Sequence, residues 1–480
     1  MNEQKPFYIT TTLPYVNADP HVGFGMELVR ADVLARFKSL TGHEVFFNTG
    51  TDEHGQKLLD DAKKAGEDVK DYVNRFAKEF KGLSSLLNVS SDIHYVRTTD
   101  THHESAAQEF WKRVSDNGYI YKKQYQVKYC VGCELEKTDS ELVDGKCPIH
   151  PTYELQLIDE ENYFFKFSEF QQPLLDFYAK NPHFVVPDFR FNEIKAFIER
   201  GLEDFSISRL KSKMSWGISV PGDDTQVMYV WFDALANYVS TLGWPEDSAQ
   251  FEKFWINGTP TQYCGKDNLR QQTAMWQAML MAARLPNSHQ VIVNGFFTGE
   301  GGIKMSKSIG NVVNPYDAVA EYGTDAFRLF VCKEVSMFED SPFTIERFAA
   351  AYNSNLVNGL GNLVSRTLTM AQTYDVDISD LRFPVFADIA HPAYERFDYA
   401  EVTTSLWSEI ADLDKYITDT EPFKTFKVDP DKARADVHHV ITGLARVSVL
   451  LQPIMPSTAE KIAELIKKRE KPSEPLFGRK

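Results

Sequence analysis

Residues 13–25 read Leu13-Pro14-Tyr15-Val16-Asn17-Ala18-Asp19-Pro20-His21-Val22-Gly23-Phe24-Gly25, and they mark the point where a strand-like segment gives way to a long helix. The preceding residues 7–13 are rich in aromatic and β-branched side chains, which are typical of a buried strand. Apolar residues then recur at helical spacing from Met26 to Leu40.

This stretch therefore places His21 near a helix N-terminus, where free N–H groups and the helix dipole favour an anion. Gly23 and Gly25 would let a ligand approach the backbone closely. The pattern indicates a phosphate-binding turn. Taken alone, however, it is better explained as an ordinary strand-to-helix connection, because one histidine with two glycines is a weak signal.

A second strand-loop-helix unit follows the first. The apolar segment Val45–Asn48 runs into the polar, glycine-flanked loop 49–55, and another helical pattern comes after it. Two such units in a row predict a doubly wound parallel sheet of the Rossmann-like α/β class, whose ligands gather at the carboxyl ends of the strands. Taken alone, Asp52 and His54 are best explained as loop-capping groups.

Composition narrows the class of protein without naming a function. The chain has 480 residues, 43% of them hydrophobic and 25% charged, as expected for a globular protein of roughly three domains. It contains neither the apolar core of a signal peptide nor an apolar run long enough to span a bilayer, which predicts a cytoplasmic protein without a membrane partner. The net charge of −16 means that any RNA binding must use local basic patches.

Three of the five cysteines crowd into a short segment together with a histidine. Cys130 and Cys133 form one pair, and Cys147 and His150 form another, a spacing that predicts a tetrahedral zinc knuckle. Four protein ligands would close the coordination sphere, so the zinc is expected to be structural. The alternative is two unrelated surface pairs.

The alternation of strands and helices returns after about residue 221 and ends near residue 345. Within it, the flexible turn 299–302 precedes a loop that carries Lys304 and Lys307. Two lysines three residues apart on a glycine-hinged loop could clamp a polyphosphate, and a solvated basic loop is the alternative.

The remainder of the chain is purely helical in pattern and predicts a helical bundle. Residues 457–460 resemble a capping box that opens the last helix. Two apolar stripes support the bundle: Val402, Leu406, Ile410, Leu413 and Ile417 in one, and Val437, Val440, Ile441, Leu444, Val447 and Leu451 in the other.

Taken together, Pro20–Phe24 and Lys304–Ser308 resemble the two signatures of class I aminoacyl-tRNA synthetases, written HIGH and KMSKS. The second signature is complete, whereas Phe24 stands where the first normally has another histidine. Within this class the chain is most similar to the methionyl-tRNA synthetases. Five further motifs and the inserted knuckle support this: 12–15, 51–55, 229–234, 265–267 and 362–366.

The resemblance implies a catalytic domain in two halves, 1–115 and 221–345, a knuckled insertion at 116–220 and an all-α anticodon-binding domain at 346–480. It implies ATP-dependent attachment of methionine to tRNA(Met) through methionyl-adenylate, with Mg²⁺ accompanying ATP. His21, Lys304 and Lys307 would be the catalytic groups. The ATP-binding residues would be His21, Gly23, Phe24, Gly265, Lys266, Asp267 and Lys307.

The resemblance also implies a methionine pocket in which Asp52 pairs with the substrate ammonium. Gln272 departs from the family pattern, because many relatives carry a histidine there. Gln272 keeps a hydrogen-bonding group but not a titratable one, so we expect less pH dependence of methionine binding. The pocket would be formed by Leu13, Tyr15, Asp52, Trp231, Ala234, Tyr238, Gln272 and Trp276.

The anticodon would be read by Asn358, Asn362 and Arg366, spaced four residues apart on one helix face, and by Phe423, which stands where the family commonly has tryptophan. Since the sequence shows no appended dimerisation domain after the last helix, we expect a monomer. Two alternatives remain open: another class I synthetase, and a catalytically silent tRNA-binding paralogue, which Phe24 would favour.

Overall fold

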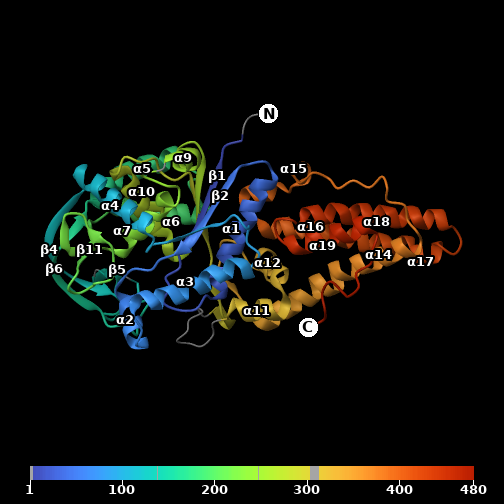
Figure 1. Ribbon diagram of the computed structural model, residues 1–480, viewed down its shortest axis with the longest axis horizontal. Coiled ribbons are helices and arrows are strands. Elements are labelled where there is room, and N and C mark those ends of the chain that lie inside the picture. Colours follow the sequence, from blue (N-terminus) through green and yellow to red (C-terminus); the bar gives the residue numbers. More distant parts are fainter. Residues whose placement is uncertain (1–3, 134, 138, 247, 303–312) are drawn as a thin grey trace. The chain divides into compact units, whose positions relative to one another are not determined.

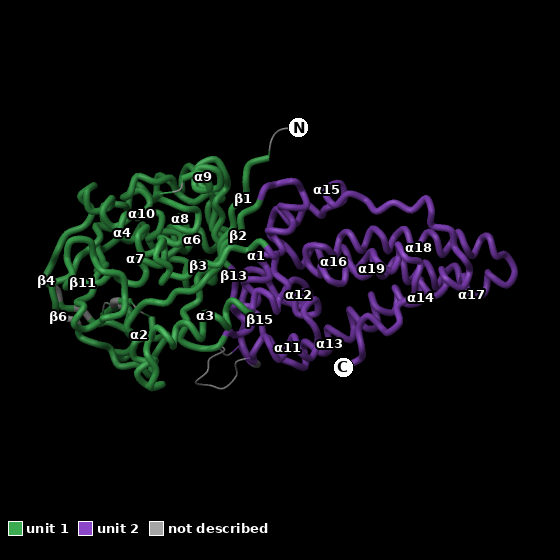
Figure 2. The backbone as a smooth tube through the Cα atoms, in the orientation of Figure 1, with its two compact units in different colours: residues 1–19, 45–82, 92–293 green, residues 20–44, 83–91, 294–480 purple. Residues whose placement is uncertain are grey.

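The computed structural model describes residues 4–133, 135–137, 139–246, 248–302 and 313–480. The chain forms two compact units, drawn in different colours in Figure 2. Unit 1 comprises residues 1–19, 45–82 and 92–293, and unit 2 comprises residues 20–44, 83–91 and 294–480. The three boundaries between the four segments expected from the sequence stay a prediction.

Unit 1 is built on a six-stranded sheet in the order β3-β2-β1-β12-β13-β7. Every residue of β1 is buried, as its aromatic and β-branched composition predicts. The β1/β2, β1/β12, β2/β3 and β7/β13 pairs are all parallel, which confirms the predicted fold class. The strands are β1 (Phe7–Thr11), β2 (Val45–Thr51), β3 (His94–Arg97), β7 (Val185–Val186), β12 (Thr259–Gly265) and β13 (Gln290–Asn294).

The strand order has a switch point at β1, because its neighbours β2 and β12 lie on opposite sides and are reached by separate connections. Ligands of such sheets bind beside the carboxyl ends of the strands at this point. The helices of unit 1 are α2 (Gln56–Ala65), α3 (Val69–Leu86, which ends in unit 2), α4 (Thr101–Asp116), α5 (Gln171–Lys180), α6 (Asp188–Glu199), α7 (Val230–Leu235), α8 (Asn237–Ser240), α9 (Ser248–Phe251) and α10 (Trp276–Ala282).

Residues 120–228 contribute two antiparallel sheets to unit 1. The larger has the order β5-β4-β6-β8, and the smaller has the order β10-β11-β9. Strands β4 and β6 pair continuously from Ile120 opposite Phe165 to Tyr129 opposite Gln156. The strands are β4 (Ile120–Cys130), β5 (Leu135–Lys137), β6 (Gln156–Phe165), β8 (Phe205–Ser206), β9 (Ser208–Leu210), β10 (Ser219–Val220) and β11 (Asp223–Met228).

Unit 2 contains the predicted bundle, in which α14, α16, α18 and α19 pack together (Figure 1). Both apolar stripes are buried except for Leu413, which is half-buried and lies over Gly443, where a Cβ atom would come within 2.4 Å of the Leu413 side chain. The elements are α1 (Val22–Leu40), α11 (Pro315–Tyr322), α12 (Thr324–Lys333), α13 (Ile345–Ala351), α14 (Asn362–Thr373), α15 (Phe386–Ile389), α16 (Tyr399–Thr420), α17 (Pro422–Thr425), α18 (Pro430–Leu450), α19 (Pro456–Lys468), β14 (Phe297–Thr298) and β15 (Ser341–Pro342).

The capping box expected at residues 457–460 is wrong. Helix α19 begins at Pro456 without a side-chain cap of its own. The carboxylate of Asp325, on α12, accepts the N–H of Thr458 at 2.6 Å instead. Among the residues that the structure describes, no helix has the length and apolar character that crossing a membrane requires.

Candidate active site

The carboxyl ends of β1, β2 and β12 bring several predicted site residues together in unit 1. Tyr15 and Asp52 form an isolated parallel bridge that extends the β1/β2 pairing. The Asp52 N–H donates to the Pro14 carbonyl at 3.0 Å, and the Val16 N–H donates to the Asp52 carbonyl at 3.3 Å. These backbone bonds hold the buried Asp52 carboxylate beside the Leu13–Tyr15 segment.

The remaining predicted pocket residues lie on α7, α8, the π-helical turn 271–275 and α10. Tyr238 and Trp276 are buried and meet edge to face, with ring centroids 5.8 Å apart. Gln272 donates from Nε2 to the Tyr238 hydroxyl oxygen at 2.5 Å. Ala234 is also buried, whereas Trp231 is half-buried. The structure thus groups Tyr238, Gln272 and Trp276 as the sequence predicted.

The indole N–H groups of Trp231 and Trp276 are buried without a hydrogen-bond acceptor among the described residues. Buried donors normally have partners, so two unsatisfied indole N–H groups, both at positions predicted to line a pocket, call for a functional explanation. A site that receives a ligand supplies one.

A buried His-Asp-His cluster lies next to these residues and was missed from the sequence, where His54 was assigned to loop capping. Asp233, on α7 between Trp231 and Ala234, contacts His54 Nδ1 at 3.3 Å and His103 Nε2 at 3.9 Å. All three side chains are at least 96% buried. The cluster joins the end of β2, helix α4 and helix α7. The sequence signal for this cluster is Asp233 itself, a charged residue inside the otherwise apolar helix α7.

The charges in this cluster support one another. Burial by itself would lower the pKa of His54, but the carboxylate of Asp233, helped by Glu104 and Glu53, outweighs burial and raises that pKa. Burial would raise the pKa of Asp233, yet the two histidines lower it. Asp233 and His54 therefore stabilise each other's charged forms.

The predicted nucleotide-binding segment Gly265–Asp267 begins at the last residue of β12 and continues into a single helical turn. Gly265 is buried, Lys266 is half-buried and Asp267 is exposed. The structure therefore places these three residues at the same carboxyl edge of the sheet as Asp52.

In unit 2, the predicted phosphate turn caps helix α1 with the side chain of His21. Its Nδ1 atom accepts the Gly23 N–H at 3.1 Å. Because a backbone N–H can only donate, Nδ1 must be unprotonated, and a neutral ring then carries its hydrogen on Nε2. The ring stacks on Phe24 with centroids 4.3 Å apart.

The two glycines of this turn make room for side chains. A Cβ atom at Gly23 would lie 2.8 Å from the His21 ring, and one at Gly25 would lie 3.2 Å from Phe327. Close approach of a ligand is therefore not needed to explain either glycine. The Val22 N–H donates to the carbonyl of Val313, directly after residues 303–312. Lys304 and Lys307 themselves lie outside the described residues.

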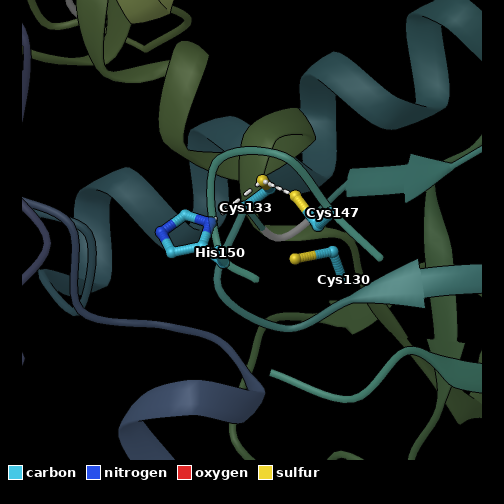
Figure 3. A group of neighbouring side chains, drawn as sticks. All are labelled: Cys130, Cys133, Cys147 and His150. Carbon is cyan, nitrogen blue, oxygen red and sulfur yellow. Dashed lines mark hydrogen bonds between the residues drawn. The ribbon is translucent and has the colours of Figure 1, made fainter. Parts of the chain in front are cut away.

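The predicted knuckle residues converge from two turns, as Figure 3 shows. One ligand atom from each of Cys130, Cys133, Cys147 and His150 lies within 4.8 Å of the others. A tetrahedral metal with bonds of about 2.0–2.3 Å holds its donors somewhat closer than this limit. Cys133 Sγ already lies 3.4 Å from Cys147 Sγ and 3.2 Å from His150 Nδ1. Gly132 makes room, since a Cβ atom there would lie 2.6 Å from the His150 ring. The four residues fit a structural metal centre of the Cys₃His type.

The predicted anticodon residues lie in the helical part of unit 2. Residues 352–361 form a π-helical segment that continues directly into α14 at Asn362. The common helix face of Asn358, Asn362 and Arg366 stays a prediction. Both asparagines are exposed, and Arg366 pairs with Asp414 at 2.8 Å. Phe423, on α17, is 44% exposed.

Comparison with known protein families shows which family this chain belongs to. The family described as class I tRNA synthetases (M) matches residues 7–156 and 153–368, and the anticodon-binding domain of methionyl-tRNA ligase matches residues 394–475. The chain belongs to the class I methionyl-tRNA synthetases.

Curated relatives of this synthetase cover most of its length. The methionine–tRNA ligase of Thermosynechococcus vestitus is 41% identical over 95% of this chain and 89% of its own. That of Rhizobium meliloti is 38% identical over 97% of this chain and 92% of its own. A solved structure of Mycobacterium tuberculosis methionyl-tRNA synthetase with methionyl-adenylate has a TM-score of 0.89 and 34% identity, covering 96% of this chain and 94% of that one.

Proposed function

We propose that this synthetase activates methionine with ATP and then esterifies tRNA(Met). The match over both the catalytic and the anticodon-binding regions carries this conclusion. In the first step the methionine carboxylate attacks the α-phosphorus of ATP, forming methionyl-adenylate and releasing pyrophosphate. This step needs no protein nucleophile, so the protein acts by positioning the reactants and stabilising negative charge.

Unit 1 would bind methionine. Asp52, buried at a strand end, offers a carboxylate for the substrate ammonium. The aromatic rings of Tyr15, Trp231 and Trp276 offer faces and edges that suit a polarizable thioether. The other proposed pocket residues are Leu13, Ala234, Tyr238 and Gln272. Gly265, Lys266 and Asp267 at the neighbouring strand end would seat the nucleotide.

Unit 2 would bind the phosphates of ATP. His21 presents Nε2–H at a helix N-terminus, a position that favours an anion through both the hydrogen bond and the helix dipole. Gly23 and Phe24 would complete this part of the ATP site. Lys304 and Lys307 would add positive charge to the leaving pyrophosphate, with Mg²⁺ bound to ATP.

We propose zinc as the metal of the knuckle. Three thiolates and an imidazole are the donor set that tetrahedral Zn²⁺ prefers, and four protein donors leave no open position for catalysis. Its role would be to hold the two turns that carry Cys130, Cys133, Cys147 and His150. Elemental analysis should find about one zinc per chain and a large loss in His150→Ala.

The bundle would bind the anticodon of tRNA(Met). Exposed amides at Asn358 and Asn362 can read base edges, and the exposed Phe423 can stack on a base. Arg366 would contribute once released from Asp414. We further propose that the protein acts as a cytoplasmic monomer, which light scattering and localisation would test.

Exchange of labelled pyrophosphate into ATP tests the first step directly. The zinc-loaded protein should support exchange with methionine and not with other natural amino acids. Exchange with another amino acid would assign a different class I specificity. Absence of exchange with every amino acid, together with retained tRNA binding, would indicate a catalytically silent paralogue.

A further inference from the structure

Three glutamines form a buried chain of hydrogen bonds behind Tyr238. Gln262 lies on β12, Gln272 in the π-helical turn 271–275 and Gln277 on α10. Their exposed fractions are 1%, 1% and 0%. Burying an amide is costly unless its donor and acceptor are both paired, so the directions of these bonds carry information.

Two backbone groups fix the first amide. Gln277 Oε1 accepts the backbone N–H of Ser288 at 3.1 Å, and Gln277 Nε2 donates to the backbone carbonyl of Gln272 at 2.9 Å. A backbone N–H can only donate and a carbonyl can only accept. The Gln277 amide therefore has one permitted orientation.

The orientation of the Gln277 amide determines which atoms donate and accept in the next hydrogen bonds of the series. Gln277 Nε2 donates to Ser288 Oγ at 3.1 Å and also to Gln262 Oε1 at 3.4 Å, which fixes the oxygen of Gln262 on this side, where it accepts the serine hydroxyl at 2.6 Å. Gln262 Nε2 then donates to Gln272 Oε1 at 2.5 Å, and Gln272 Nε2 donates to Tyr238 Oη at 2.5 Å. The Tyr238 oxygen is thus an acceptor toward Gln272, and its own hydrogen must point elsewhere.

We propose that Gln262 is a positioning residue for methionine recognition, which orients the Gln272 amide and thereby makes the Tyr238 hydroxyl a donor toward the substrate side chain. This inference rests on the proposed function, in which Tyr238 lines the methionine pocket. The thioether sulfur is the only acceptor in the methionine side chain. Norleucine, which has a methylene in place of sulfur, cannot accept this bond.

Replacing Gln262 by glutamate tests the direction of the chain. An ionised carboxylate can only accept, so the Gln272 amide would rotate and turn its oxygen toward Tyr238, which would then donate to Gln272. A protonated carboxyl group accepts with one oxygen and donates with the other, as the glutamine does. Burial raises the pKa of a carboxyl group, so this switch would fall in the accessible pH range.

Titration of the other ionisable groups near these three glutamines would not produce a pH dependence specific to Gln262→Glu. Burial raises the pKa of Tyr8 and of Tyr178, which contact the Tyr238 and Thr273 carbonyls. Tyr238 is itself a buried phenol, and His289 is exposed and follows Ser288. All four are present in the wild type as well, so a comparison of variant with wild type isolates the new carboxyl group.

The experiment measures methionine-dependent and norleucine-dependent pyrophosphate exchange at about pH 6 and about pH 8.5. The proteins are the wild type, Gln262→Glu and the matched surface variant Gln250→Glu, whose side chain is exposed. For Gln262→Glu at the higher pH, we expect the KM for methionine to rise about tenfold and the preference over norleucine to fall comparably, with kcat little changed. Both should recover at the lower pH, and Gln250→Glu should follow the wild type.

A KM that is unchanged, or raised equally at both pH values, would overturn the proposal. If Gln262→Glu lacks a cooperative thermal transition, Ser288→Ala replaces it, because it removes the donor to Gln262 without adding charge. A smaller KM increase that does not vary with pH is then expected, and no increase would overturn the relay. Absence of exchange in the wild type would instead refute the proposed function.

Discussion

Two histidines of this synthetase are held by different means, and their surroundings favour different protonation states. His21 is fixed as an acceptor at Nδ1 by the Gly23 N–H two residues away, so its neutral ring directs Nε2–H outward. His54 is buried against Asp233, which lies far along the chain and favours the charged ring. The comparison shows two uses of a histidine. A hydrogen bond from the nearby backbone orients His21 so that it can donate to a ligand, whereas the ion pair with the distant Asp233 lets His54 connect separate elements of the fold.

Removing the His21 ring should have the largest effect. His21→Ala is expected to lower pyrophosphate exchange by about 100- to 1000-fold, the usual loss when one donor to a developing charge is deleted. His21→Ser separates this loss from capping, because serine can still cap α1. If His21→Ser loses as much exchange activity as His21→Ala but keeps the wild-type Tm, the result supports a contact between His21 and phosphate. Losses of threefold or less would remove His21 from catalysis.

Neutralising Asp233 should mainly cost stability. Asp233→Asn leaves His54 and His103 buried without their carboxylate, and breaking a buried pair costs about 3–5 kcal/mol of unfolding free energy. Urea denaturation at pH 7 measures this. The exposed Asp116, on α4, provides the matched control: Asp116→Asn should change stability by less than about 0.5 kcal/mol. Similar values for the two variants would show that the buried cluster contributes nothing.

The pH dependence of stability should identify which histidine is charged. Since the folded pKa of His54 is raised, its contribution is complete below the unfolded value near 6.5 and is lost as pH rises through the folded pKa. The Tm difference between wild type and His54→Gln should therefore be largest near pH 6 and shrink toward pH 9. A difference that grows with pH would mean that His54 is buried neutral.

The smallest effect is expected for Phe24→His, which restores the residue normal for the family. The replacement ring can still stack on His21, so exchange should change by about threefold or less. A loss as large as that of His21→Ala would make Phe24 an equal partner in the ATP site and end the distinction between them.

Features set by local pattern could be predicted from the sequence. The parallel sheet, the strand-end position of Asp52, the knuckle residues and the two apolar stripes all depend on spacing within a short window. Groups that meet across the fold could not be predicted in this way. Asp233 pairs with His103, and Gln262 pairs with Gln272, in each case between separate elements. The sequence around one member of such a pair does not indicate which residue is its partner.

One local rule failed because tertiary structure supplied another solution. Ser457 does not cap α19, and a carboxylate held by a neighbouring helix, that of Asp325, accepts the Thr458 N–H in the first turn of α19 instead.

The close approach of Gly23 to the His21 ring also restricts how this turn can vary. A side chain at position 23 would collide with the ring that caps the helix, since the gap to a Cβ atom would be only 2.8 Å. Position 23 can therefore accept alanine only if position 21 first becomes smaller, and a smaller residue there gives up the imidazole. The two positions are therefore coupled: as long as the imidazole stays at position 21, position 23 is restricted to glycine.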